Sequence, residues 1–120
     1  MYEFKEITLR NAKHEKKRLV INFKDPKYAI LAEFLMSDAH LLREEIAQAK
    51  NKILKNIKSK IMFSGNRCAV EIENGVTEIT DLYMDEEDGG YETLNLPTQE
   101  FFVFVNLWSE AIANFNSENN

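Results

Sequence analysis

The Asn74-Gly75 dipeptide is the feature that most constrains the fold of this chain. A two-residue hairpin turn of type I′ needs positive φ at both central positions, and Asn followed by Gly adopts that geometry readily. Such a turn pairs the segments on its two sides in antiparallel register, with Val70 opposite Ile79. Alternate residues of the two strands then form a core face: Val70, Ile72, Thr77 and Ile79.

The other face of this predicted hairpin carries two carboxylates, Glu71 and Glu78, directly opposite each other. Like charges at such a position cost about a few tenths of a kcal/mol. A sequence that keeps this pair therefore needs a compensating interaction elsewhere.

Strands and helices are also predicted before this hairpin. Alternating apolar residues indicate strands at residues 2–11 and 17–24, joined by a short turn. Asp25-Pro26 predicts a helix start, because proline at the first helical position has no hydrogen bond to lose. A second helix follows, with Ser37 or Asp38 as its expected cap. Apolar stripes at helical spacing indicate the two helices: Ile30, Leu31, Phe34 and Leu35, then Leu42, Ile46, Ala49, Ile53 and Ile57.

After the hairpin we expect a short strand at residues 91–96 and a final helix capped by Thr98. Residues 116–120 are expected to fray. The predicted order is β-β-α-α-β-β-β-α in a single domain spanning residues 1–120. The predicted class is α+β, with a mostly antiparallel sheet of about five strands and helices packed on one face. The final helix is indicated by a second apolar stripe: Phe101, Val105, Trp108, Ile112 and Phe115.

Charge is divided at Arg67. All 15 Lys and Arg lie within residues 1–67, whereas twelve of the 20 Asp and Glu lie within residues 68–120, so the two parts have formal charges of +7 and −12. A field of this kind favours a charged partner. Acidic residues that solvate a sheet face and basic residues that solvate helices would give the same composition.

Composition excludes several classes of protein. Apolar residues make up 44% of the chain and aromatic residues 11%, which excludes a disordered chain. Apolar runs such as Phe101–Val105 are far shorter than the roughly 20 residues of a membrane span. The first residues lack the features of a secretory signal, and the single Cys68 cannot form an intrachain disulfide. We therefore expect a soluble, cytoplasmic protein.

No catalytic, cofactor or metal site is predicted. Cys68 alternates with core residues and is expected to be a buried apolar side chain. His14 and His40 lie away from any Cys or His at metal-ligand spacing, and the contiguous acids of residues 85–88 do not match a calcium-binding loop. The chain also lacks a glycine-rich phosphate loop. We expect a protein that is not an enzyme and needs no cofactor.

The acidic part of the chain predicts a binding surface for a cationic partner. Clustered carboxylates repel one another in the free protein, so a cationic partner gains attraction and also relieves that repulsion. The predicted surface consists of these carboxylates: Glu71, Glu73, Glu78, Asp81, Asp85, Glu86, Glu87, Asp88 and Glu92.

A succession of short segments resembles a known family. These segments are Ile30-Leu31-Ala32-Glu33-Phe34-Leu35-Met36-Ser37-Asp38, Ser64-Gly65-Asn66, Val70-Glu71-Ile72, Thr80-Asp81-Leu82-Tyr83 followed by acids, Glu100-Phe101 and Trp108. Together they resemble small immunity proteins of bacterial polymorphic toxin systems, of which contact-dependent growth inhibition systems are the best known. The resemblance spans roughly residues 26–110 and does not include the N-terminal hairpin.

The resemblance implies a non-enzymatic inhibitor, encoded beside a toxin whose C-terminal domain is often a nuclease. Such an inhibitor binds the toxin in the cytoplasm and covers its active site. The resemblance transfers no contact residue, so the contacts are predicted from charge alone. The alternative is a small nucleic-acid-binding or regulatory module that uses the basic N-terminal part. The formal net charge of −5 disfavours that alternative, and solvation of helix ends accounts for the lysines more simply.

Overall fold

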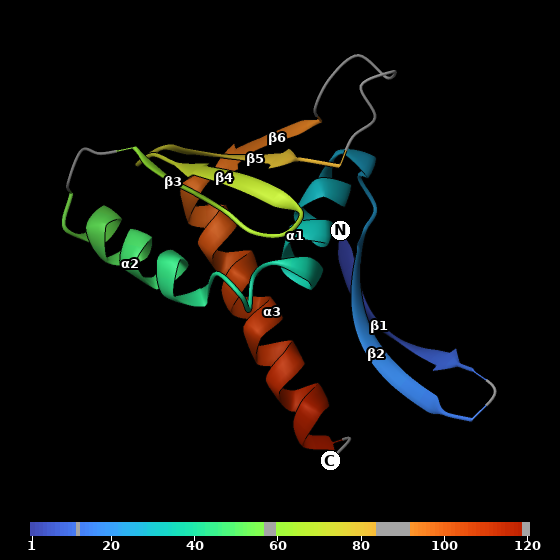
Figure 1. The fold of residues 1–120 in the computed structure, drawn as a ribbon. Helices are drawn as coiled ribbons and strands as arrows, with labels where there is room; N and C mark the ends of the chain where they lie inside the picture. Colours follow the sequence, from blue (N-terminus) through green and yellow to red (C-terminus); the bar gives the residue numbers. More distant parts are fainter. Residues whose placement is uncertain (12, 57–59, 84–91, 119–120) are drawn as a thin grey trace.

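The computed structural model describes residues 1–11, 13–56, 60–83 and 92–118, and it confirms the α+β class (Figure 1). No helix in these ranges is long and apolar enough to cross a membrane. The elements follow one another in this order: β1 (Tyr2–Arg10), β2 (Glu15–Phe23), the 3-10 turn η1 (Pro26–Tyr28), α1 (Ala29–Ser37), α2 (Arg43–Leu54), β3 (Ile61–Ser64), β4 (Cys68–Ile72), β5 (Val76–Asp81), β6 (Thr93–Pro97) and α3 (Thr98–Glu118).

The strands form two antiparallel sheets instead of the single sheet of about five strands that the sequence predicts. One sheet is the β1–β2 hairpin, and the other has four strands in the order β3-β4-β5-β6. The edge strand β3 was not predicted, because Ile61–Ser64 begins with three consecutive apolar residues instead of an alternating pattern. The predicted register of β4 and β5 is confirmed, with Val70 opposite Ile79 and Glu71 opposite Glu78.

The turn between β4 and β5 is not the predicted type I′ turn. Neither Asn74 nor Gly75 adopts a left-handed backbone conformation. The first residue of α3 holds the turn instead: the Thr98 hydroxyl donates to the Glu73 carbonyl over 2.5 Å, and the Thr98 N–H donates to the Gly75 carbonyl over 3.3 Å. The Thr98 hydroxyl also lies 2.9 Å from that of Thr77. The side chain expected to cap α3 therefore fixes the neighbouring hairpin.

Helices α1 and α3 cover one face of the four-stranded sheet (Figure 1). At the centre of this core, the fully buried rings of Phe34 and Phe101 have centroids 5.6 Å apart. Helix α2 buries Ile46 and Ala49 but ends at Leu54, and Ile57 of its predicted stripe lies outside the described residues. Helix α3 runs to Glu118, so it includes residues 116–118, which were expected to fray.

Asp38 ties the end of α1 to the turn between β3 and β4. It is fully buried, and its carboxylate accepts hydrogen bonds from the backbone N–H groups of Cys68 (2.7 Å), Asn66 (3.0 Å) and Arg67 (3.0 Å). The expectation that Ser37 or Asp38 caps the second helix was wrong, since the N-cap of α2 is Leu42 and has no side-chain hydrogen bond. The buried carboxylate satisfies turn donors that would otherwise have no partner.

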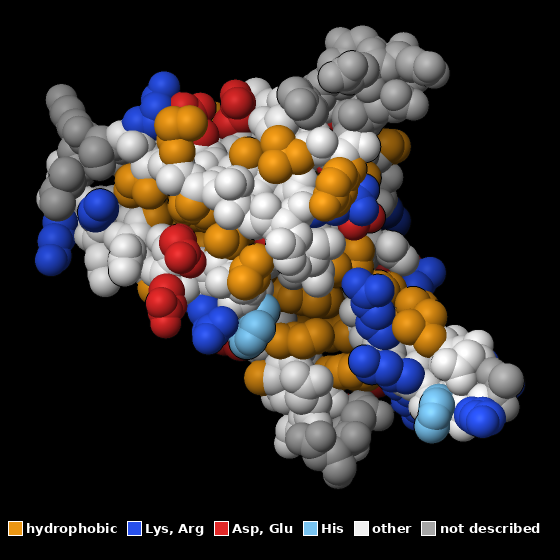
Figure 2. Space-filling view, in the orientation of Figure 1, with side chains coloured by type: hydrophobic (Ala, Val, Ile, Leu, Met, Phe, Trp, Pro, Cys, Tyr) orange, Lys and Arg blue, Asp and Glu red, His pale blue; other side chains and the backbone are white. Residues whose placement is uncertain are grey.

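The β1–β2 hairpin is anchored at one end only. The rings of Tyr2 and Phe23 meet Phe104 of α3, with centroids 5.6 and 5.2 Å from it. Every described residue from Lys5 to Arg18 is exposed. This part of the hairpin, residues 5–18, is called the arm below. Figure 2 shows Lys and Arg side chains gathered along it.

Candidate functional site

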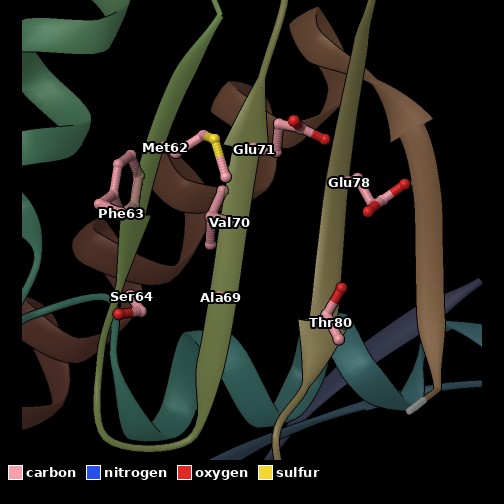
Figure 3. Close-up of a pocket in the computed structure, with 8 residues that line it drawn as sticks. All are labelled: Met62, Phe63, Ser64, Ala69, Val70, Glu71, Glu78 and Thr80. Atoms are coloured by element: carbon pink, nitrogen blue, oxygen red, sulfur yellow. The ribbon is translucent and has the colours of Figure 1, made fainter. Parts of the chain in front are cut away.

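The face of the four-stranded sheet turned away from α1 and α3 is not covered by any described helix (Figure 1), and Figure 3 views the sheet from this side. It has a depression of about 410 Å³ over β3, β4 and β5. This surface is called the open face, and its outward side chains on these strands and the following turn are Met62, Ser64, Ala69, Glu71, Glu73, Val76, Glu78 and Thr80.

One row of side chains crosses the open face from edge to edge. Strand pairing places Met62 beside Glu71, Glu71 beside Glu78 and Glu78 beside Asn95. Met62 is an apolar side chain that is 71% exposed. The row therefore combines an exposed apolar contact at the β3 edge with two opposed carboxylates at its centre.

Lys60 partly neutralises this row. Its ammonium lies 3.1 Å from a Glu71 oxygen and 3.5 Å from a Glu73 oxygen. The hydrogen bond to Glu71, followed by the charge of Glu71 and the weaker Glu73 interaction, raises the pKa of Lys60. Glu78 forms no ion pair with any described residue. The sequence analysis missed Lys60, because only the pairing of the unpredicted strand β3 with β4 brings it to these carboxylates.

Asp81 does not belong to the open face, which corrects the prediction. It is 7% exposed and shares the core-facing side of β5 with Thr77 and Ile79. Its carboxylate accepts a hydrogen bond from the Arg67 guanidinium over 3.4 Å and another from the Tyr83 N–H over 2.9 Å. Asp81 is therefore a structural ion-pair partner at the end of β5.

Arg67 connects three parts of the chain. Besides Asp81, it pairs with Glu33 of α1 over 3.4 Å, and its guanidinium carbon lies 5.9 Å from the centre of the Tyr83 ring. Burial is the largest single influence on Arg67 and lowers its pKa. The charges of Glu33 and Asp81 together outweigh burial, so the pKa of Arg67 is raised. The last cation of the sequence thus joins α1 to the end of β5 and is not available to the open face.

The structure brings together three of the predicted carboxylates: Glu71, Glu73 and Glu78. Glu92 is exposed but precedes β6, where its carbonyl accepts the Asp81 N–H. The remaining four, Asp85, Glu86, Glu87 and Asp88, lie outside the described residues.

The chemistry of Cys68 agrees with the core position predicted for it. The side chain is fully buried, and burial is the main cause that raises the pKa of its thiol to about 12. His14 and His40 are exposed. Among the described residues, no group of three or more His, Cys, Asp or Glu is placed to hold a metal ion.

Comparison with known proteins adds no relative to this description. No protein-family model, no curated protein and no solved structure matches this chain significantly.

Proposed function

We propose that this chain is a non-enzymatic inhibitor of the immunity-protein type, whose open face covers a cationic surface of a toxin domain such as a nuclease. The proposal rests on the opposed pair Glu71 and Glu78, which lies on a sheet face that no described helix covers (Figure 1). The pair costs free energy in the free protein. A lysine or arginine of a partner would remove that cost and add attraction.

The rest of the open face suits a protein partner better than a small molecule. The depression is shallow, and the exposed Met62 at its border offers an apolar contact of the kind that interfaces favour. An active site that binds phosphates is cationic, so a nuclease has the charge that matches Glu71 and Glu78. The immunity-protein resemblance of residues 26–110 gives the same class of partner.

The first test is isolation of the complex. The tagged chain would be co-expressed with the toxin domain encoded by the neighbouring gene and purified through the tag. We expect a stoichiometric complex in which the activity of the toxin is lost. Failure of the toxin domain to co-purify would contradict the proposal.

The second test places the contact on the open face. The variant Glu71→Gln/Glu78→Gln should lower the association rate constant about tenfold at low salt and flatten its salt dependence, because steering by these charges is removed. The control variant Glu110→Gln/Glu118→Gln changes the same net charge at exposed positions of α3 and should associate like the wild type. Equal rates for all three proteins would exclude the open face as the contact surface.

A measurement on the free protein completes the design. Glu78→Gln should raise the free energy of unfolding by up to about a few tenths of a kcal/mol, because it removes the repulsion and keeps the Lys60 contacts. Loss of binding together with a gain in stability would identify Glu78 as a residue retained for the partner.

A further inference from the structure

The arm has the features of a surface for a second, anionic partner. It contains six Lys and Arg but only two Glu, a formal charge of +4 in a chain whose formal net charge is −5. Arg10 pairs with Glu15 over 3.7 Å, and Lys5 pairs with Glu3 over 3.2 Å. The other four cations form no ion pair with any described carboxylate: Lys13, Lys16, Lys17 and Arg18.

These four cations are distributed around the arm. Strand pairing places Arg18 opposite Ile7 and Lys16 opposite Leu9 on one face, whereas Lys17 is opposite Thr8 on the other face. Lys13 lies at the tip. A flat protein surface would contact the cations on one face of the arm only. A groove with phosphates along both walls would contact cations on both faces of a ribbon inserted into it.

The arm also has a suitable shape and a defined tip. A ribbon of two strands fits the major groove of B-form DNA, which is about 12 Å wide, and the six β1 residues of the arm span about 20 Å. The Asn11 side chain accepts hydrogen bonds from the N–H groups of Lys13 (3.1 Å) and His14 (2.9 Å), and the Asn11 N–H donates to the His14 carbonyl (3.0 Å). These contacts tie Asn11 to Lys13 and His14 across the turn.

The acidic residues of the chain do not prevent such binding. Charges separated by more than a Debye length, about 8 Å at physiological salt, are largely screened. The molecule measures 51 × 39 × 26 Å, and the arm projects from the body on the helix side of the sheet, away from the open face (Figure 1). The anionic field of the open face therefore acts weakly at the arm.

We propose that the arm binds double-stranded DNA through the phosphate backbone, with Lys13, Lys16, Lys17 and Arg18 as the contact residues. An anionic membrane is a poorer match, because a flat surface contacts one face of the arm, whereas Lys16 and Lys17 lie on opposite faces. This surface is separate from the open face, so the DNA proposal does not depend on the inhibitor proposal.

The test is a binding titration with matched variants. The probe is a fluorescein-labelled duplex of about 20 base pairs and mixed sequence, followed by anisotropy from about 50 to 200 mM salt. The arm variant is Lys13→Gln/Lys16→Gln/Lys17→Gln. The control variant removes the same charge near the end of α2: Lys50→Gln/Lys52→Gln/Lys55→Gln. Circular dichroism and thermal melting would verify that both variants fold.

We expect the wild type to bind with micromolar affinity at the lowest salt. The arm variant should bind at least about a hundredfold more weakly, and the slope of log K against log salt should fall by about 2.7, because each lost phosphate contact contributes about 0.9. The control variant should retain the wild-type slope.

Several results would overturn the proposal. One is the absence of DNA binding by the wild type at low salt, and another is an equal loss in both variants. A third is arm-dependent binding to vesicles rich in phosphatidylserine without binding to DNA. Self-association of the arm variant, with no DNA binding by the wild type, would show that the cations only protect the edges of the ribbon from pairing.

Discussion

Gly65 is required by the close approach of a buried carboxylate. A β-carbon at Gly65 would lie 2.6 Å from Cγ and 2.8 Å from Oδ2 of Asp38, closer than such atoms approach in proteins. Asp38 cannot move away without weakening its hydrogen bonds to the N–H groups of residues 66–68. Two segments that are far apart in the sequence, one ending at Asp38 and one containing Gly65, therefore form one structural unit.

This contact predicts unequal effects of two Gly→Ala substitutions. Gly65→Ala should lower the free energy of unfolding by about 1–3 kcal/mol, because the new methyl group overpacks the site. Gly75→Ala should leave it unchanged or raise it by up to about 1 kcal/mol, since nothing lies within 4 Å of a β-carbon there and the backbone is not left-handed. Urea denaturation followed by circular dichroism measures both values, and equal changes would contradict the role given to Asp38.

Cys68 gives a prediction about pH. Burial raises the pKa of its thiol from 9.0 to about 12, so above pH 9 the thiol ionises in the unfolded chain but not in the folded one. The unfolded state then binds fewer protons, and stability is lost as pH rises. Between pH 8 and pH 10 the wild type should lose about 1.4 kcal/mol of unfolding free energy relative to Cys68→Ala. Urea denaturation of both proteins at the two pH values measures this difference, and parallel pH profiles would show that the folded thiol also ionises.

At the scale of elements, the β1–β2 hairpin depends on both α1 and α3 for its stability. An isolated two-stranded hairpin is marginally stable in water, and the described residues of the arm add no buried side chain. The contacts that hold the hairpin come from its anchored end, where β2 packs on α1 with Leu19 and Ile21 buried, and where Tyr2 and Phe23 meet Phe104 of α3. The hairpin should therefore open more readily than the β3–β6 sheet, which packs on α1 and α3.

Removal of the Phe104 ring tests this dependence. Phe104→Ala should lower the free energy of unfolding by about 2 kcal/mol, because the ring is only half-buried, and should reduce hydrogen-exchange protection mainly in β1 and β2. The control is Val103→Ala, at the preceding position of α3, where the side chain is 53% exposed. Its exchange pattern should match that of the wild type. A uniform loss of protection in Phe104→Ala would show that the ring supports the whole core rather than the hairpin.

At the scale of the whole molecule, the alternation of apolar and polar residues predicted the pairing of strands that are neighbours in the sequence. Alternation around the Asn74-Gly75 turn predicted the pairing of Glu71 with Glu78, and that register also places Asp81 on the core side with Ile79. The assignment of Asp81 to the acidic surface was therefore wrong, and the predicted register of β4 and β5 already placed this residue on the core side.

Contacts between distant segments were not predictable in this way. The position of Lys60 beside Glu71 depends on strand β3, whose sequence does not alternate between apolar and polar residues. The separation of the hairpin from the main sheet depends on the packing of Tyr2 and Phe23 against Phe104, a residue near the other end of the chain. Alternation within one segment carries no information about such packing.

The charge division at Arg67 corresponds to two surfaces on different parts of the fold, and this predicts that they act independently. Glu71→Gln/Glu78→Gln should change association with the toxin domain but leave the DNA titration within about twofold of the wild type, because the arm projects away from the open face (Figure 1) and salt screens distant charges. The arm variant should show the reverse pattern. Both assays on both variants, at two salt concentrations, measure the coupling. A tenfold change in the assay of the surface that a variant leaves unchanged would mean that the two surfaces share one partner or one electrostatic field.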